Sequence, residues 1–246
     1  MIDELNQLKI VDQISNLIND YRNSISYSDD EMDTGISLEN VTYSYADKPP
    51  ILINCNIEAP KRKATLILGE NGSGKTTILK LLANYATPKE GKIHPEMKKL
   101  IIGYSASDGS DLNPFLRVID IIKMIREDQG DLVWIEKAIT LLGIPNSKDS
   151  RIRSLSSGEK KKFSILRAFL VGRELILLDE PESHLDFVTR DIVSHVISRM
   201  SKIVTIVLAS HDMSFIEKCY CENVYILKPI EQGTKKYTAS KINLGH

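Results

Sequence analysis

A polyphosphate-binding pattern occupies residues 69–77, which read GENGSGKTT. Its glycines are Gly69, Gly72 and Gly74. A glycine backbone can take positive φ and turn its N–H groups toward an anion. Lys75 can neutralise phosphate charge, and the hydroxyl of Thr76 can bind Mg²⁺. An apolar run at 64–68 precedes the pattern, and apolar residues with helical spacing follow it at 78–82. The sequence therefore predicts a phosphate-binding loop between a strand and the N-terminus of a helix.

Two carboxylates and a histidine follow two further predicted strands. Residues 175–181, LILLDEP, are typical of a strand buried on both faces, and Asp179 and Glu180 stand at its end. A second buried strand, at 203–209, ends just before His211. Because the carboxyl ends of parallel strands meet at one edge of a sheet, we expect these side chains beside the phosphate-binding loop. Adjacent carboxylates are costly there without a cation, which favours a metal at the same edge.

Composition limits the classes of protein that fit. The 246 residues are 42% hydrophobic and 26% charged, as in one globular domain or one domain with an inserted lobe. The formal net charge is −1, so bulk charge gives no support to nucleic-acid binding. Cys55, Cys219 and Cys221 are too few for a disulfide framework and are expected to be free thiols in a reducing compartment. The longest apolar run is too short to cross a bilayer, and the first residues lack the pattern of a signal peptide.

Two regions are expected along the chain. Residues 1–34 form an amphipathic helix followed by an acidic linker at 23–35, and residues 35–246 form the main domain. The apolar side of the helix consists of Leu5, Leu8, Val11, Ile14, Ile18 and Tyr21. This side can pack on the chain's own domain or dock on a partner, and the sequence leaves both open. Two helical runs, with Ile119, Ile122 and Ile125 in the first and Ile135, Ile139 and Leu142 in the second, predict a helical lobe at about 105–165.

Further strands are predicted at 36–41, 51–57 and 100–104. Between the last two, Pro88, Gly91 and Pro95 are expected to interrupt regular structure. The pattern as a whole predicts an α/β core with a helical insertion.

Five motifs in this order resemble the nucleotide-binding domain of the ATP-binding cassette (ABC) family, from about residue 35 to about residue 228. The motifs are GENGSGKT at 69–76 (Walker A), LSSGE at 155–159 (signature), LILLDEP at 175–181 (Walker B), SHLD at 183–186 (D-loop) and His211 (switch histidine). The resemblance implies a phosphate-loop NTPase core with a mostly parallel sheet, an antiparallel β subdomain and an inserted α-helical lobe.

The same resemblance implies roles for individual residues. ATP would be bound by Tyr45, Gly69, Glu70, Asn71, Gly72, Ser73, Gly74, Lys75, Thr76 and Thr77, with Tyr45 stacked on adenine. Mg²⁺ would be held by Thr76 and Asp179, Glu180 would orient or deprotonate the attacking water, and His211 would contact the γ-phosphate and position Glu180.

The resemblance also implies a head-to-tail dimer with a second ABC ATPase domain. The residues that would act on the partner's nucleotide are Ser156, Ser157, Gly158 and Glu159 of the signature and Asp186 of the D-loop. A helix that starts at the signature would point N–H groups at an anion, and nothing in the sequence places it beside its own Lys75.

Three positions depart from the family pattern. Ser107 stands where the family usually has a glutamine, Ser157 replaces the first signature glycine, and Glu159 replaces the signature glutamine. The basic run that follows, Lys160 to Lys162, is interpreted as a solvated helix face or as positive charge near the partner's phosphates. Glu180 and His211 are both retained, so we expect slow but real turnover.

Three functions fit these motifs. The first is the ATPase of an exporter, at the cytoplasmic face of a membrane and bound to a transmembrane permease domain or subunit. The region before residue 36 is similar to the connector that precedes the cassette in fused exporters. The second is a soluble, non-transport ABC ATPase in the cytoplasm, and the third is a regulatory nucleotide-binding module with weak turnover. No nucleic-acid partner is expected.

Overall fold

The structure of the chain is a computed structural model. The structure describes residues 4–24, 35–95, 100–125, 139–140, 142–144, 149–231 and 233–242. The predicted linker lies mostly outside the described residues, as does Ile135 of the second predicted helical run.

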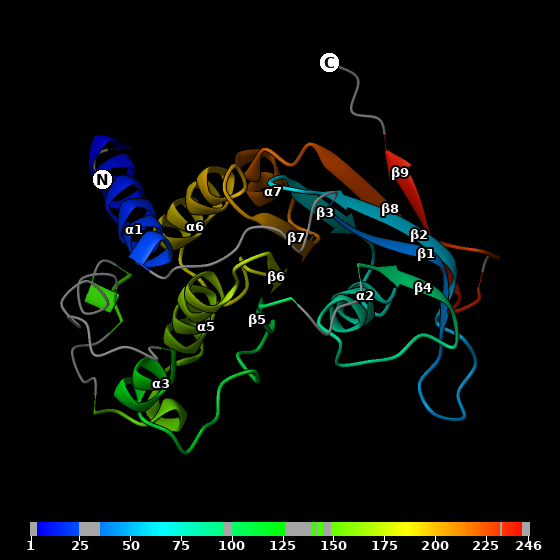
Figure 1. Ribbon diagram of the computed structural model, residues 1–246, viewed down its shortest axis with the longest axis horizontal. Coiled ribbons are helices and arrows are strands. Elements are labelled where there is room, and N and C mark those ends of the chain that lie inside the picture. The colour runs from blue at the N-terminus through cyan, green and yellow to red at the C-terminus, as the bar shows by residue number, and fades with distance from the viewer. Residues whose placement is uncertain are drawn as a thin grey trace.

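Helices and strands alternate between residues 157 and 229, whereas three strands follow one another between residues 35 and 68 (Figure 1). The α-helices are α1 (Glu4–Ser24), α2 (Lys75–Leu82), α3 (Val118–Ile125), α5 (Ser157–Val171), α6 (Phe187–Met200) and α7 (Met213–Cys219). The strands are β1 (Gly35–Tyr43), β2 (Leu52–Pro60), β3 (Ala64–Leu68), β4 (Glu90–His94), β5 (Ile102–Ser105), β6 (Leu175–Asp179), β7 (Thr205–Ser210), β8 (Asn223–Pro229) and β9 (Tyr237–Ile242).

All nine of these strands belong to one sheet, in the order β4-β1-β2-β9-β8-β3-β7-β6-β5. Strands β8, β3, β7, β6 and β5 run parallel to one another, whereas β1 is antiparallel to β2 and β4, and β9 is antiparallel to β8. Every residue of β6 and β7 is buried, as expected for parallel strands covered on both faces. The predicted fold class, a mostly parallel α/β sheet with an antiparallel part and a helical lobe, is confirmed.

Each face of the sheet has its own hydrophobic core. Alternate residues of β6 point to opposite faces, so Ile176 and Leu178 join one core while Leu175 and Leu177 join the other. The first core also contains the apolar residues of α1, α5, α6 and α7, and the second contains those of α2, β1 and β2. Figure 1 shows α5 and α6 on the opposite side of the sheet from α2. This packing fixes the carboxyl ends of the parallel strands as one rigid edge.

Helix α1 packs on the chain's own domain. Val11, Ile14 and Ile18 are 0–2% exposed and join the core beside α5 and α6. Asp12 also forms an ion pair with Arg199 of α6. Of the two alternatives for this helix, packing against its own domain is therefore the one observed, although Leu8 remains 42% exposed.

The Pro and Gly cluster does not interrupt regular structure as predicted. Strand β4 lies there instead, antiparallel to β1, with Ile93 opposite Leu38. Gly91 explains the error: its φ is +86°, and a Cβ on it would come within 2.4 Å of the carbonyl oxygen of Asn40. Glycine at this position permits the close approach of the edge strand β4 to its neighbour β1.

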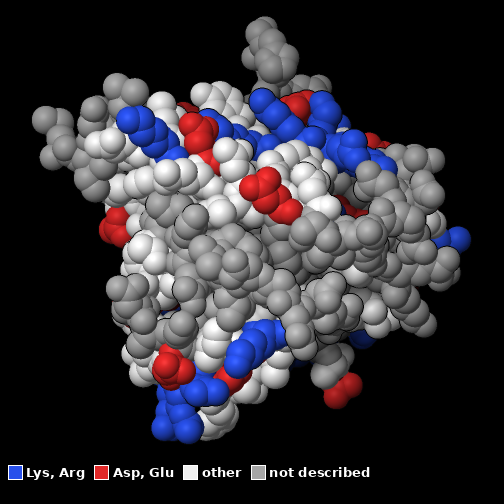
Figure 2. All heavy atoms as spheres, turned by 60° about the vertical axis from the view of Figure 1, so that its left-hand side comes forward, with Lys and Arg blue, Asp and Glu red and all other residues white. Residues whose placement is uncertain are grey.

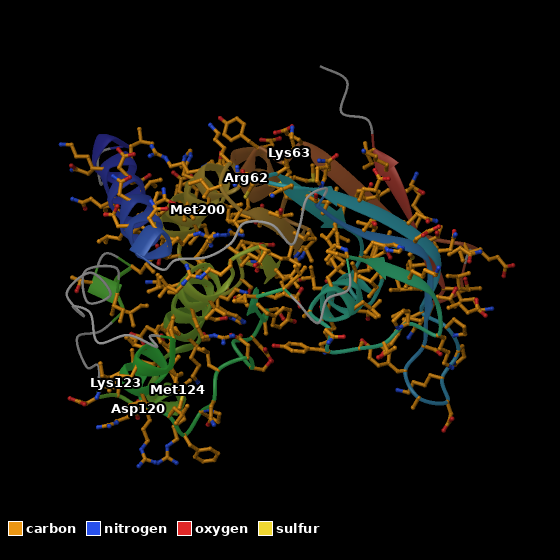
Figure 3. All side chains as sticks on the ribbon, viewed as in Figure 1. Arg62, Lys63, Asp120, Lys123, Met124 and Met200 are labelled. Atoms are coloured by element: carbon orange, nitrogen blue, oxygen red, sulfur yellow. The ribbon has the colours of Figure 1, made fainter. Side chains whose placement is uncertain are left out.

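The surface carries charges of both signs. Figure 2 shows Lys and Arg gathered along the upper edge and at the lower end of one face, with Asp and Glu among them. In the helical lobe, Asp120, Lys123 and Met124 lie on the outer side of α3, and Met124 is 67% exposed, whereas Met200 at the end of α6 is buried (Figure 3). Among the described helices, none combines the length and the apolar character that a membrane span requires.

Candidate functional site

A cavity of about 350 Å³ opens at the carboxyl edge of the parallel strands. It is lined by Tyr45, Ile51, Asn71, Gly72, Gly74, Lys75, Thr76, Thr77, Ser107 and Glu180. Six of these are residues that the sequence assigns to nucleotide binding or catalysis, besides the glycines that shape the loop. The structure therefore brings most of the predicted phosphate, metal and catalytic residues to one place.

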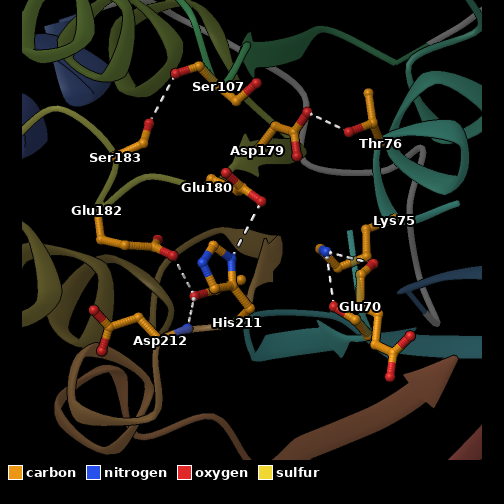
Figure 4. Close-up of polar contacts among 12 residues, drawn as sticks. Glu70, Lys75, Thr76, Ser107, Asp179, Glu180, Glu182, Ser183, His211 and Asp212 are labelled. Atoms are coloured by element: carbon orange, nitrogen blue, oxygen red, sulfur yellow. Dashed lines mark hydrogen bonds and ion pairs between the residues drawn. The ribbon is translucent and has the colours of Figure 1, made fainter. Parts of the chain in front are cut away.

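The phosphate-binding loop joins β3 to α2 as predicted. Gly72 and Gly74 have φ values of +81° and +102°, a region that side chains with a Cβ rarely adopt. The loop curls around Lys75, whose Nζ donates hydrogen bonds to the carbonyl oxygens of Gly69 at 2.8 Å and Glu70 at 3.1 Å (Figure 4). Since α2 begins at Lys75, its free N–H groups and the ammonium face the same region, as an anion site requires.

Thr76 and Asp179 form the second part of the site. The Thr76 hydroxyl donates to Asp179 Oδ2 at 2.8 Å (Figure 4). Asp179 is 1% exposed, and its Oδ1 has no hydrogen-bond partner within the described part of the chain. Burial raises the pKa of this carboxyl, and the Thr76 hydrogen bond opposes that rise. An orphaned, buried carboxylate oxygen beside a hydroxyl fits a hard divalent cation such as Mg²⁺.

The described residues contain no group of three or more His, Cys, Asp and Glu side chains that could hold a metal by themselves. A Mg²⁺ ion at Thr76 and Asp179 would therefore depend on phosphate oxygens and water for its other ligands, as Mg²⁺ in nucleotide sites usually does. The donor set fits a metal that arrives with its nucleotide.

Glu180 lines the cavity, and His211 forms a pair with it. His211 Nδ1 lies 3.3 Å from Glu180 Oε1, and the two side chains are 55% and 24% exposed (Figure 4). Glu180 has a φ of +43°, which is uncommon for a residue with a side chain. Its N–H donates to the carbonyl oxygen of Ala209, and its carbonyl oxygen accepts from Ser183 N–H, both at 2.9 Å. These bonds hold a strained conformation, as is common at functional sites.

Glu182 and Ser210 support this pair, and the sequence analysis missed both. The Ser210 hydroxyl donates to Glu182 Oε1 at 2.6 Å and accepts from the Asp212 N–H at 3.1 Å (Figure 4). Ser210 and Asp212 flank His211, and Glu182 lies two residues after Glu180. The chain of bonds thus connects the two backbone segments that carry the catalytic candidates.

Glu182 also makes stability depend on pH. It is 4% exposed, its Oε2 has no partner among the described residues, and burial raises its pKa, with the Ser210 hydrogen bond opposing the rise. A raised folded-state pKa means that the folded protein holds the proton longer than the unfolded chain. Stability is therefore lost as pH rises above the ordinary value of 4.5 through the folded-state pKa.

Glu182→Gln, which cannot ionise, is expected to be more stable than the parent at neutral pH, with the difference closing below pH 4.5. Urea midpoints across the pH range measure this. Glu217→Gln on the exposed side of α7 is the control, because its carboxylate is solvated. A Glu182→Gln variant less stable than the parent at neutral pH would contradict the expectation.

Tyr45 lies at the far end of the cavity. Its Oη shares a hydrogen bond of 2.7 Å with Thr77 Oγ1, and its ring meets that of Tyr43 edge-on with centroids 5.0 Å apart. The ring is 40% exposed, so one face can receive an aromatic base.

Ser73 differs from its neighbours in the phosphate-binding loop, because it is fully buried and its hydroxyl has no partner within the described residues.

The signature residues stand apart from the cavity. Ser156 caps α5: its hydroxyl accepts from the Glu159 N–H, and the Glu159 carboxylate accepts from the Ser156 N–H, a capping box. Gly158 packs against the chain between Walker B and α6, where a Cβ would come within 2.8 Å of the carbonyl oxygen of His184. Asp186 caps α6 through the Thr189 N–H. The structure therefore does not bring Ser156, Ser157, Gly158, Glu159 or Asp186 together with the chain's own phosphate loop.

Both interpretations of the basic run fail for Lys161. It is neither solvated nor near the surface, because it is 0% exposed and donates to the carbonyl oxygens of Ala106 and Asp179. Helical periodicity explains the difference, since Lys161 lies on the same face of α5 as the buried Ser164 and Ala168. That periodicity was the signal available in the sequence.

Ser107 lines the cavity where a longer glutamine was expected from the family pattern. Its carbonyl oxygen accepts a hydrogen bond of 2.8 Å from the Ser183 hydroxyl (Figure 4). The loop after β5 is therefore tied through its backbone to the chain that follows Walker B.

A phosphate-binding loop between β3 and α2, with carboxylates at the ends of neighbouring parallel strands, defines this protein as a phosphate-loop nucleotide-binding protein. Residues 52–183 match the family model described as ABC transporter. The chain belongs to this family, and ATP is accordingly the expected ligand of the cavity.

Curated relatives include the putative ABC transporter ATP-binding protein TTE0246 of Caldanaerobacter subterraneus, 30% identical over 80% of this chain and 88% of its own length. The uncharacterized ABC transporter ATP-binding protein YfmR of Bacillus subtilis is 34% identical over 62% of this chain, and the match spans 24% of YfmR. The energy-coupling factor transporter ATP-binding protein EcfA3 of Clostridium perfringens is 25% identical over 85% of this chain and 83% of its own length.

Among solved structures, the ATP-binding cassette MJ0796, a dimer in a post-hydrolysis state bound to ADP and Pi, is similar in fold. Its TM-score is 0.69 at 20% identity, covering 85% of this chain and 99% of MJ0796. The match shows that the two chains share a fold.

Proposed function

We propose that this chain is the ATP-hydrolysing motor of an ABC exporter, acting as a head-to-tail dimer on a transmembrane permease. The observation that carries the ATPase part is the convergence at one cavity of the Lys75 ammonium, the Thr76–Asp179 pair and the Glu180–His211 pair. These groups supply phosphate charge neutralisation, a metal site and a base, which are the parts that phosphoryl transfer to water needs.

Each residue would have a role in ATP binding or hydrolysis that follows from its charge and position. The N–H groups of the loop and Lys75 would bind the β- and γ-phosphates of ATP, while Tyr45 would stack on adenine. Thr76 and Asp179 would hold Mg²⁺, which supplies positive charge next to the phosphates. Glu180 would accept a proton from the attacking water, and His211 would hold the Glu180 carboxylate in orientation through the 3.3 Å contact.

A dimer is proposed because the signature does not serve its own cavity. Ser156 and Ser157 are exposed at the N-terminus of α5, whose free N–H groups can face an anion from another subunit. Two copies arranged head to tail would each complete the other's cavity with these residues and Asp186. The dimeric state of the similar cassette MJ0796 supports this arrangement.

The transport part of the proposal rests on the family and on the N-terminal region. The region from Val11 to residue 35 is similar to the connector of fused exporters, and α1 anchors it to α5 and α6. Residues 1–34 are accordingly proposed as a connecting unit and residues 35–246 as the ATPase domain. A permease partner would place the chain at the cytoplasmic face of a membrane.

The ATPase proposal predicts phosphate release from ATP that requires Mg²⁺ and stops when EDTA removes it. Sedimentation with ATP and Mg²⁺ should show a dimer that dissociates after hydrolysis. Purification from membranes should recover a multi-span protein with the chain. Turnover that persists in EDTA would contradict the metal site, and recovery of a soluble assembly without a membrane protein would contradict the exporter.

A regulatory nucleotide-binding module is the second candidate, and Ser107 is the observation that favours it. A serine side chain in the cavity cannot reach as far as the family's glutamine toward a metal or water. Tight ATP binding without phosphate release would support this function over the motor.

A further inference from the structure

The buried lysine of α5, Lys161, is not used by the reaction described above. Its side chain is fully buried, and its Nζ donates hydrogen bonds to the carbonyl oxygens of Ala106 at 2.8 Å and Asp179 at 2.6 Å. Both acceptors are backbone atoms, so the ammonium forms a bridge between the loop after β5 and the end of β6. Neither hydrogen bond goes to a carboxylate.

The two acceptors precede two residues of the cavity. Ala106 comes directly before Ser107, and Asp179 comes directly before Glu180; both Ser107 and Glu180 line the cavity. The peptide between Asp179 and Glu180 is held on both sides, since its carbonyl accepts from Lys161 and its N–H donates to Ala209. Lys161 thus helps to fix the strained backbone of Glu180, whose φ is +43°.

Lys161 also belongs to the helix that carries the signature. Helix α5 begins at Ser157, and Lys161 lies one turn further along on its buried face. Other bonds attach α5 to the strand and loop of Ser107: the Ser164 hydroxyl contacts Ser105 Oγ at 2.7 Å, and Arg167 donates to the Tyr104 carbonyl at 3.0 Å. Lys161 extends this attachment to the end of β6.

The energetics argue against a purely stabilising role. Lys161 is fully buried, and taking an ammonium group out of water has a cost. An apolar side chain of similar length would avoid that cost but would leave the carbonyl oxygens of Ala106 and Asp179 without this donor. What the ammonium adds is two directed hydrogen bonds.

We propose that Lys161 is a positioning residue that links the signature helix to the backbone of Glu180 and Ser107. This inference rests on the proposed dimeric ATPase. In that dimer the N-terminus of α5 meets the partner's nucleotide. A displacement of α5 then reaches the chain's own Glu180 through the bond to the Asp179 carbonyl, and Ser107 through the bond to the Ala106 carbonyl. Lys161 then carries the coupling between the two nucleotide sites in place of the longer side chain missing at Ser107.

The test compares Lys161→Met, which keeps the length and removes the donors, with Lys161→Gln, which keeps N–H donors. Lys202→Met, in the exposed turn after α6, is the matched control. Lys161→Met is expected to lower kcat about 10- to 100-fold, as misplaced catalytic groups do, with the Kd for a fluorescent ATP analogue nearly unchanged. Its Tm should fall by several degrees, because two carbonyl oxygens lose their donor, so kcat is compared at a temperature well below both Tm values. Lys161→Gln should recover part of kcat.

Hydrogen exchange gives a readout that needs no turnover. The Glu180 amide, which donates to Ala209, should exchange faster in Lys161→Met than in the parent or in Lys202→Met. An inactive parent would contradict the proposed function and leave this exchange measurement to decide the present inference. An unchanged Glu180 exchange rate, an unchanged kcat in an active parent, or a loss of activity that only follows a lower Tm would each overturn it.

Discussion

Glu180→Gln is expected to lower the rate of ATP hydrolysis about 10²- to 10⁴-fold, the range associated with loss of a general base. The amide keeps the size and hydrogen-bonding reach of the carboxylate but cannot accept the proton of water. Glutamine has a Cβ, as glutamate does, so the φ of +43° at this residue strains the variant no more than the parent. ATP binding should be retained, because phosphate contacts come from the loop and Lys75.

Single-turnover kinetics with ATP and Mg²⁺ measure the chemical step, and equilibrium binding measures the affinity. Because binding survives while hydrolysis does not, the variant should also accumulate as an ATP-bound dimer in sedimentation experiments. Glu217→Gln on α7 is the control for the loss of one negative charge, since that side chain is exposed. Hydrolysis by Glu180→Gln at the parental rate would show that another group activates the water, and the motor proposal would fail with it.

The chemistry of the site could be predicted because its residues must follow one another in the chain. A loop that wraps a phosphate needs its glycines, its lysine and its threonine within a few residues, so the motif at 69–77 is visible without a structure. Strands β6 and β7 were equally visible, because a parallel strand covered on both faces is apolar without interruption. Asp179 and His211 could then be placed at the ends of these strands.

The supporting residues could not be predicted from position in the same way. Lys161 and Glu182 are charged residues that are buried, and charged side chains are buried only when partners from distant segments receive them. Those partners, Ala106, Asp179 and Ser210, are known only after the strands have been arranged. A sequence pattern gives the face of α5 on which Lys161 lies. It does not show that the carbonyl oxygens of Ala106 and Asp179 lie next to that face.

Strand β4 was mispredicted for a related reason. Together with Pro88 and Pro95, Gly91 predicts a break in regular structure, whereas in the fold it leaves room for the backbone of Asn40 in a neighbouring strand. A glycine can lie in a turn, or it can lie in a strand where another backbone comes close. Which of the two occurs depends on what packs against the glycine. Local sequence therefore predicts the reacting groups better than it predicts the edge strand of the sheet.

Lys75→Met is expected to weaken ATP binding by about 2–5 kcal/mol, the cost of removing one partner of a buried hydrogen-bonded charge pair, or roughly 30- to 4,000-fold in Kd. Lys75 is 5% exposed and its Nζ is already held beside the loop by Gly69 and Glu70, so little ordering is needed when a phosphate arrives. Methionine fills similar space but leaves the phosphates without this charge. Isothermal titration with ATP and Mg²⁺ measures the loss.

Thermal unfolding separates this loss of affinity from a loss of folding. The Tm of Lys75→Met without nucleotide should be close to that of the parent, while the rise in Tm on adding ATP, which follows mass action, should largely disappear. Lys80→Met, in the last turn of the same helix α2 and outside the cavity lining, should keep both the affinity and the rise in Tm. If Lys75→Met binds ATP as tightly as Lys80→Met, the triphosphate does not sit in this loop. The Thr76–Asp179 and Glu180–His211 pairs would then have no phosphate to act on, because their placement matters only relative to that anion.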